Sequence, residues 1–293
     1  MRGPAFLHKR ICKRICQSVG VLLAFAFLYK SLGAPLDHAT ITEVVNDVKI
    51  LDPQSLQGSP ARTSAIFKTP EIMQTGAASR SEMVAEDQTI TRVGADTLFS
   101  FEPRERTINL RQGSILFQSP SGKGGGVIRT ESATASVLGT TIIVVATRDG
   151  GFKILVLEGT AQVTMPNGSR RIVHGGQLVV IKPGATQPGP VRDFLLSDEV
   201  ATSRLVNGFR RRLPSWQKIQ KEILTQNQEI ANGEFNAPTV VIGSIPDPNL
   251  TINQIQSRRA RPVQTPSPGV SAGSPKIIPV PPVKKPGNPT GKP

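Results

Sequence analysis

Few residues in this sequence are of the types that catalyse reactions or hold a metal ion. Two of its three histidines, His38 and His174, lie beyond residue 33, and the chain has no HExxH or CxxC motif. A zinc site needs three or four Cys, His or carboxylate ligands at a defined spacing. His174 lies in RIVHGGQLVVI, and no Gly-x-Ser-x-Gly motif accompanies it, so we expect an exposed turn histidine rather than a general base. The sequence predicts no catalytic residue, no metal site and no cofactor.

A glycine-rich segment and scattered carboxylates are the other candidates for chemistry. Gly122-Lys123-Gly124-Gly125-Gly126 resembles a phosphate-binding loop, but it lacks the Gly-Lys-Ser/Thr ending, and residues 127–130 read as a strand instead of a helix. A pair of carboxylates could hydrolyse an envelope carbohydrate, and this stays as an alternative. Nothing in the spacing selects two of the candidates: Glu82, Glu86, Asp87, Asp96, Glu102, Glu131 and Glu158. We therefore predict that the chain is not an enzyme.

Residues 1–33 have the order of an export signal. Five basic residues between Arg2 and Arg14 precede an apolar run at 19–29, and small residues follow up to Gly33 and Ala34. The run is shorter than the ~20 residues of a helix that spans a bilayer, which favours a signal removed after Gly33. An uncleaved membrane anchor is the alternative. Both interpretations predict an exported chain.

The net charge of +14 is concentrated at the two ends of the chain. Residues 1–30 and 248–293 contain Lys and Arg but no Asp or Glu, so the part between them is nearly neutral. Only one Trp and one Tyr are available to stack on bases. We therefore predict no nucleic-acid partner. Cys12 and Cys16, the only cysteines, precede the apolar run, so a processed chain would have no disulfide.

The region between Thr40 and about Ile181 consists of short alternating runs rich in Val, Ile, Thr and Phe. Runs of this kind, separated by Gly, Asn or Pro, are typical of antiparallel strands in a sandwich or barrel. Asp149-Gly150-Gly151 and Asn167-Gly168 are predicted to be tight turns with positive φ. After an opening run at 41–50, strands are predicted at 81–85, 89–93, 97–101, 107–110, 114–117, 127–130, 135–138, 141–146, 153–157, 161–165, 171–173 and 177–181.

A helical period replaces the alternation near Phe194 and continues to about Ile230, with Ser215 as a candidate N-cap of the second helix. We expect these helices to cover an edge or end of the sheet. Beyond Gly233 the sequence is rich in proline and predicts a disordered tail. The predicted organisation is a signal or anchor at 1–33, a β domain at 40–193 with its core at 70–183, a helical segment at 194–232, and a Pro-rich basic tail at 233–293.

An ordered series of motifs between residues 70 and 183 resembles the FecR domain, the exported β-domain of ferric-citrate-type sensor regulators in bacteria. The most specific motifs are ASVLGT at 135–140, followed by an apolar strand, and VLEG at 156–159. The resemblance implies an antiparallel β-sandwich or jelly-roll-like fold. We assign structural roles to the motif residues: Gly139 a bend or close backbone approach, Gly159 a turn or bulge, and Glu158 a hydrogen bond to that turn. The other motif residues are Val137, Leu138 and Thr140.

The resemblance also limits the predicted function. Full-length regulators of this family carry a sigma-factor-binding domain before a membrane helix, whereas about eighteen residues precede the apolar run here, too few for a folded domain. We predict a stand-alone, non-catalytic binding or scaffolding module of the bacterial periplasm or cell envelope. Its partner would be an envelope protein or glycan, and only an uncleaved N-terminal segment would contact the membrane. The alternative is a membrane-anchored sensor or signal-transduction regulator.

Overall fold

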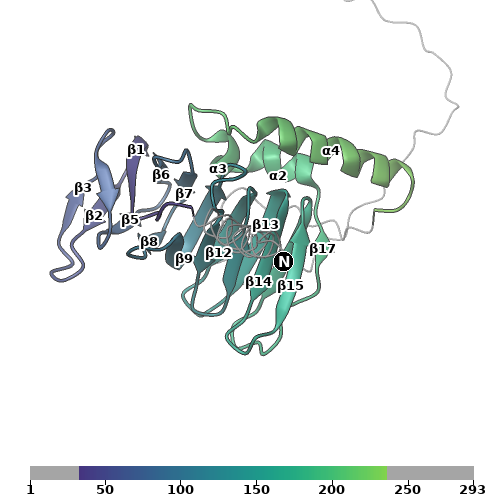
Figure 1. Cartoon of the computed structure of the whole chain (residues 1–293), viewed down its shortest axis with the longest axis horizontal. Helices are drawn as coiled ribbons and strands as arrows, with labels where there is room; N and C mark the ends of the chain where they lie inside the picture. Colours follow the sequence, from purple (N-terminus) through teal and green to yellow (C-terminus); the bar gives the residue numbers. More distant parts are fainter. Residues whose placement is uncertain (1–32, 236–293) are drawn as a thin grey trace, which may run out of the picture. The chain divides into compact units, whose positions relative to one another are not determined.

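The computed structural model describes residues 33–235, most of which lie in β-strands (Figure 1). This confirms the predicted mainly β fold with helices at its C-terminal side. The predicted signal or anchor, apart from Gly33, and the predicted tail beyond residue 235 lie outside the described residues. No helix in the described part of the chain is long and apolar enough to cross a membrane.

The strands form two sheets that share one long strand, β9 (Thr107–Gln118). Sheet A has the order β4 (Ile66–Lys68), β1 (His38–Val45), β6 (Arg80–Val84), β7 (Ile90–Val93), β9, β12 (Thr141–Ala146), β13 (Phe152–Glu158), β16 (Gln177–Ile181) and β17 (Arg192–Asp193). Sheet B has the order β3 (Gly58–Pro60), β2 (Val48–Leu51), β5 (Ile72–Thr75), β8 (Leu98–Phe101), β9, β10 (Gly126–Arg129), β11 (Thr134–Val137), β14 (Thr160–Thr164) and β15 (Arg170–His174). The β9–β10 pair is parallel, and the other pairs are antiparallel.

The main core lies between the two sheets. It contains Ile41, Met83 and Ile142 from sheet A, and Met73 and Val163 from sheet B. Three phenylalanine rings pack at one end of this core, with centroids 5.1, 5.3 and 5.9 Å apart: Phe67, Phe99 and Phe101. The cysteine-free domain is therefore stabilised by apolar burial between its layers.

A second apolar cluster covers the outer face of sheet A. In β12, Ile142 and Val144 point into the main core, whereas Ile143 and Val145 pack on the opposite face. The strand is buried on both faces because α2 (Leu196–Thr202), α3 (Arg204–Asn207) and α4 (Trp216–Ala231) supply the opposing side chains. This explains why β12 reads as a continuous apolar run rather than an alternating one.

A buried ion pair connects this helical cover to sheet A. Arg92 of β7 has no exposed side-chain surface, and its Nε donates to Oε2 of Glu82 at 2.8 Å. Its Nη1 donates to the carbonyl oxygens of Leu205 (3.0 Å) and Val206 (2.7 Å), and its Nη2 donates to that of Arg211. The guanidinium group thus satisfies carbonyl groups at the C-terminal end of α3, where a positive charge is favourable.

The structure differs from the predicted elements at several points. The predicted strands at 107–110 and 114–117 are one strand, β9, because Gly113 adopts φ +92° and lets the strand pass from sheet B to sheet A. The short strands β3, β4, β5 and β17 were not predicted. Ser215 is the N-cap of α4 but makes no capping hydrogen bond, because its hydroxyl bonds Oγ1 of Thr141.

Candidate functional site

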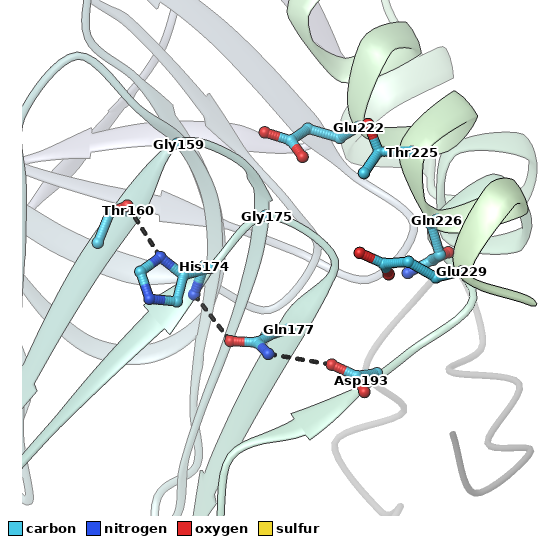
Figure 2. Close-up of a pocket in the computed structure, with 10 residues that line it drawn as sticks. All are labelled: Gly159, Thr160, His174, Gly175, Gln177, Asp193, Glu222, Thr225, Gln226 and Glu229. Carbon is cyan, nitrogen blue, oxygen red and sulfur yellow. Dashed lines mark hydrogen bonds between the residues drawn. The ribbon is translucent and has the colours of Figure 1, made fainter. Parts of the chain in front are cut away.

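A polar cavity of about 390 Å³ lies between α4 and residues at or beside the ends of β13, β14, β15, β16 and β17 (Figure 2). Because its strand-side residues come from both sheets and its helix-side residues from α4, only the folded chain brings them together. The lining residues are Gly159, Thr160, His174, Gly175, Gln177, Asp193, Glu222, Thr225, Gln226 and Glu229. The cavity is the candidate binding site of the described residues.

The strand side of the cavity is held in place by a chain of hydrogen bonds. Oγ1 of Thr160 lies 3.2 Å from Nδ1 of His174, and the His174 backbone N–H donates to Oε1 of Gln177 at 3.1 Å. Nε2 of Gln177 in turn donates to Oδ1 of Asp193 at 3.1 Å (Figure 2). Thr160 thus orients the His174 ring, and the His174 backbone and Asp193 together hold the Gln177 side chain, so this wall is preorganised for binding.

The helix side of the cavity is one face of α4. Glu222, Thr225, Gln226 and Glu229 are three or four residues apart, which places them on the same side of a helix. Gln226 is buried; its Oε1 accepts from the Leu196 N–H and its Nε2 donates to the Phe194 carbonyl, both at 2.9 Å. These two bonds fasten α4 to the first residue of α2 and to the segment that precedes it.

The cavity is acidic. Asp193, Glu222 and Glu229 line it, and none of its lining residues is Lys or Arg. Within residues 33–235, these three carboxylates take part in no ion pair shorter than 4.0 Å. In the same part of the chain, no group of three His, Cys, Asp or Glu side chains is arranged to hold a metal ion. The arrangement suits a positively charged group that donates hydrogen bonds.

The two motifs that carry the sequence resemblance meet beside this cavity. Gly139 (φ +66°) lies where the chain passes from sheet B to sheet A, and Gly159 (φ +83°) where it passes back. Oγ1 of Thr140 donates to the carbonyl of Thr160 at 3.0 Å, and a Cβ at Gly159 would lie 2.9 Å from that Oγ1. The motifs are thus two adjacent crossings that require close backbone approach.

Other motif residues have different surroundings. Val137 is buried and belongs to the main core, whereas Leu138 is 72% exposed. Glu158 does not bond to the turn that follows it; its Oε1 accepts a hydrogen bond from Oγ1 of Thr141 at 2.7 Å. Burial raises the pKa of Glu158, and the hydrogen bond from Thr141 opposes this shift. Glu158 is therefore a buried structural group beneath α4.

The residues considered for catalysis are dispersed. His174 is exposed at the end of β15 and lines the cavity, but none of the seven carboxylates considered for hydrolysis does so. Glu82 is buried against Arg92, and the glycine segment at 122–126 leads into strand β10, with no helix behind it. The cavity acids were missed because Glu222 and Glu229 read as the solvent face of an amphipathic helix, and Asp193 as part of a connection.

The fold and cavity define a two-sheet β domain with a helical cover. Within it, residues 71–162 match the sequence model of the FecR protein family. The match ends within β14 and includes only Gly159 and Thr160 of the cavity.

Two crystal structures of a protein described as a candidate anti-sigma factor from Parabacteroides distasonis resemble the chain. Their TM-scores are 0.38 and 0.37, with 17% and 16% sequence identity. Each alignment covers 42% of this chain and 59% of that protein, so the chain spans about 59% of its length. No curated protein matches the chain.

Proposed function

We propose that this chain is an exported, non-catalytic binding module of the bacterial periplasm or cell envelope. The order of features in residues 1–33 and the FecR domain support this location. The observation that carries the proposal is the preorganised acidic cavity beside α4. It would receive a positively charged group, an ammonium or guanidinium, of an envelope protein or glycan.

Four titratable groups have pKa values shifted by burial. Burial raises the pKa of Glu158 and Glu199 and lowers that of Arg92 and Lys153. None of these four groups lines the cavity. They lie beneath the helical cover, where they serve the fold.

A comparison of variants tests the proposal. The full chain, immobilised, should retain a reproducible partner from solubilised envelope fractions of the native host. Replacing Glu222 and Glu229 by Gln removes two cavity charges without changing the side-chain shape, so retention of that partner should fall at least tenfold. The control is Glu131→Gln, because Glu131 is exposed on the turn between β10 and β11. Equal retention by wild type and the cavity variant would refute binding at the cavity.

A membrane-anchored sensor is the second candidate, and the first described residues favour it. Leu36 is 1% exposed and its N–H donates to the Glu105 carbonyl at 2.8 Å, while Arg106 donates to the Ala34 carbonyl at 2.6 Å. The folded domain therefore begins directly after the predicted cleavage position, without a linker. N-terminal sequencing of the protein from its native host distinguishes the candidates, because a mature chain that begins near Ala34 would eliminate the anchored form.

A further inference from the structure

We propose that the anchored form of this protein holds one defined surface against the membrane, and that this surface contacts anionic phospholipids. We call it the glycine-loop surface; it consists of residues 121–125, Leu138 and Lys218. The inference rests on the anchored version of the proposed function. It adds to that version an orientation of the domain and a lipid partner.

The point where the chain enters the domain determines which surface lies near the membrane. Gly33 packs against the backbone of the glycine loop: a Cβ at Gly33 would overlap the Lys123 carbonyl, and a Cβ at Gly124 would lie 2.7 Å from Cα of Gly33. Arg106 holds both sides of this contact, since its Nε donates to the Gly125 carbonyl at 2.8 Å and its Nη1 donates to the Ala34 carbonyl. The attachment is therefore part of the fold.

The distance between this attachment and the apolar run is short. The run ends at Tyr29, four residues before Gly33. Four residues span at most about 14 Å even when fully extended. If the run is inserted in the membrane, the glycine loop must lie within about that distance of the end of the run. The turn that contains Glu105 is the other part of the described domain held at the entry point, because its carbonyl accepts from the Leu36 N–H at 2.8 Å.

The chemistry of the glycine-loop surface fits a membrane interface. Leu138 is 72% exposed, and it is adjacent to the loop because a Cβ at Gly125 would lie 3.0 Å from Cα of Leu138. Lys123 is exposed, and Nζ of Lys218 donates to Oγ of Ser121 at 2.9 Å. An exposed apolar side chain flanked by lysines is the pattern that binds the headgroup region of anionic membranes. A single exposed Leu is common, but this one lies beside the entry point of the chain.

Site-specific fluorescence in vesicles tests the orientation. The full chain, with Cys12 and Cys16 replaced by Ser, would be reconstituted in vesicles of phosphatidylethanolamine and phosphatidylglycerol. An environment-sensitive fluorophore would be attached through Leu138→Cys or, as a matched control, through Leu56→Cys. Leu56 is also largely exposed, at 64%, but lies in the turn between β2 and β3 at the edge of sheet B.

We expect the label at position 138 to shift to shorter wavelength and to be quenched at least twofold more by headgroup-region quenchers than the label at 56. Lys123→Glu should weaken this quenching because it replaces attraction to anionic lipid by repulsion. Equal, weak quenching at both positions in a chain that floats with the vesicles would overturn the orientation but leave the anchor intact. A chain that does not float with vesicles would overturn both the anchor and this inference.

Discussion

Arg92 illustrates how one buried side chain can join two parts of the fold. Its guanidinium group binds Glu82 within sheet A and three carbonyl groups of the C-terminal helical segment. The Phe209 ring lies 4.6 Å from the guanidinium carbon and completes its surroundings. Because Arg remains charged even when buried, every one of its donors needs a partner. Arg92 therefore positions the helical cover as well as balancing the charge of Glu82.

Replacing Arg92 by Met should destabilise the protein by about 3–5 kcal/mol, because Glu82 would keep a buried charge without a partner. Urea-induced unfolding followed by circular dichroism measures this change. Arg111→Met, at an exposed position of β9, should cost less than about 0.5 kcal/mol. The double variant Arg92→Met/Glu82→Gln should be more stable than Arg92→Met alone, because it no longer buries an unpaired carboxylate. If Arg92→Met lowered the free energy of unfolding as little as Arg111→Met does, Arg92 would not hold the helical cover on sheet A.

Glu199 on α2 is a second buried charge, but it is incompletely paired. Its side chain faces Lys153 of β13 without a contact shorter than 4.0 Å, and among residues 33–235 its Oε2 is one of the few buried polar atoms with no hydrogen-bond partner. Burial raises the pKa of Glu199 to about 7, against a smaller opposing effect of Lys153. The folded protein therefore favours the protonated form of this carboxyl group.

The stability of the protein should consequently depend on pH near neutrality. A carboxyl whose folded pKa is raised from 4.5 to about 7 contributes fully below pH 4.5, and its contribution is lost as the pH rises through 7. A shift of that size corresponds to about 3 kcal/mol. Glu199→Gln should thus be more stable than wild type at pH 8 and similar to it at pH 4.5, as measured by thermal unfolding.

The neighbouring exposed residue supplies the control for this titration. Asp198→Asn removes a carboxylate from the same helix at an exposed position and should leave the pH dependence unchanged. Burial also raises the pKa of Glu158, so the pH dependence of the wild-type stability has more than one source. The difference between wild type and Glu199→Gln isolates the contribution of Glu199. Parallel pH profiles of these two proteins would show that Glu199 titrates normally.

At the scale of elements, β9 is the strand on which the two sheets depend. Its first half pairs with β8 and β10, and its second half pairs with β7 and β12. Gly113 makes this possible: it has φ +92°, and a Cβ at this position would overlap Thr97. A residue with a side chain would meet both backbone strain and a steric clash.

Two glycine substitutions separate the cost of backbone strain from the cost of a steric clash. Gly168 has φ +83° in the turn between β14 and β15, and a Cβ there would meet nothing within 4 Å. Gly168→Ala should cost about 1–2 kcal/mol, the penalty of a left-handed conformation alone. Gly113→Ala should cost at least about 2 kcal/mol more, because overpacking is added. Equal midpoints of urea unfolding for the two variants would contradict the tight crossing in β9.

At the scale of the whole molecule, the segment that matches the FecR family is smaller than the structural unit. Residues 71–162 exclude β1, which pairs with β6, and β16, which pairs with β13. They also exclude the helices that cover Leu155 and Leu157. Residues 71–162 alone would expose unpaired strands and an apolar sheet face, both of which favour aggregation.

We therefore expect residues 34–235 to unfold in a single cooperative transition, and residues 71–162 alone to remain unfolded or aggregated. Circular dichroism and the dispersion of amide signals in NMR spectra measure the difference. A fragment of residues 34–193, which lacks the helices, should bind an apolar dye at the exposed face of sheet A. A well-dispersed spectrum of the 71–162 fragment would show instead that the family segment is an independent domain.

Much of this architecture is encoded locally. Alternating runs rich in Val, Ile and Thr predicted strands such as β12 and β13, since the side chains of a strand alternate between two faces. The positive φ values of Gly150 and Gly168 confirm the two predicted turns. The ASVLGT and VLEG motifs indicated the resemblance to the FecR family, whose sequence model matches residues 71–162. Local patterns were sufficient where a feature depends on neighbours in the sequence.

Tertiary structure alone decided how distant residues meet. Sequence periodicity did not join the two halves of β9, because Gly113 reads as a break and only its partner strands show that pairing continues. It placed Glu222 and Glu229 on the polar face of α4, and only the packing of α4 against sheet A shows that this face borders the cavity beside His174 and Asp193; Glu222 is half-buried there and Glu229 is exposed. Periodicity shows which side of an element is polar; whether that side faces water or a cavity depends on the elements packed against it.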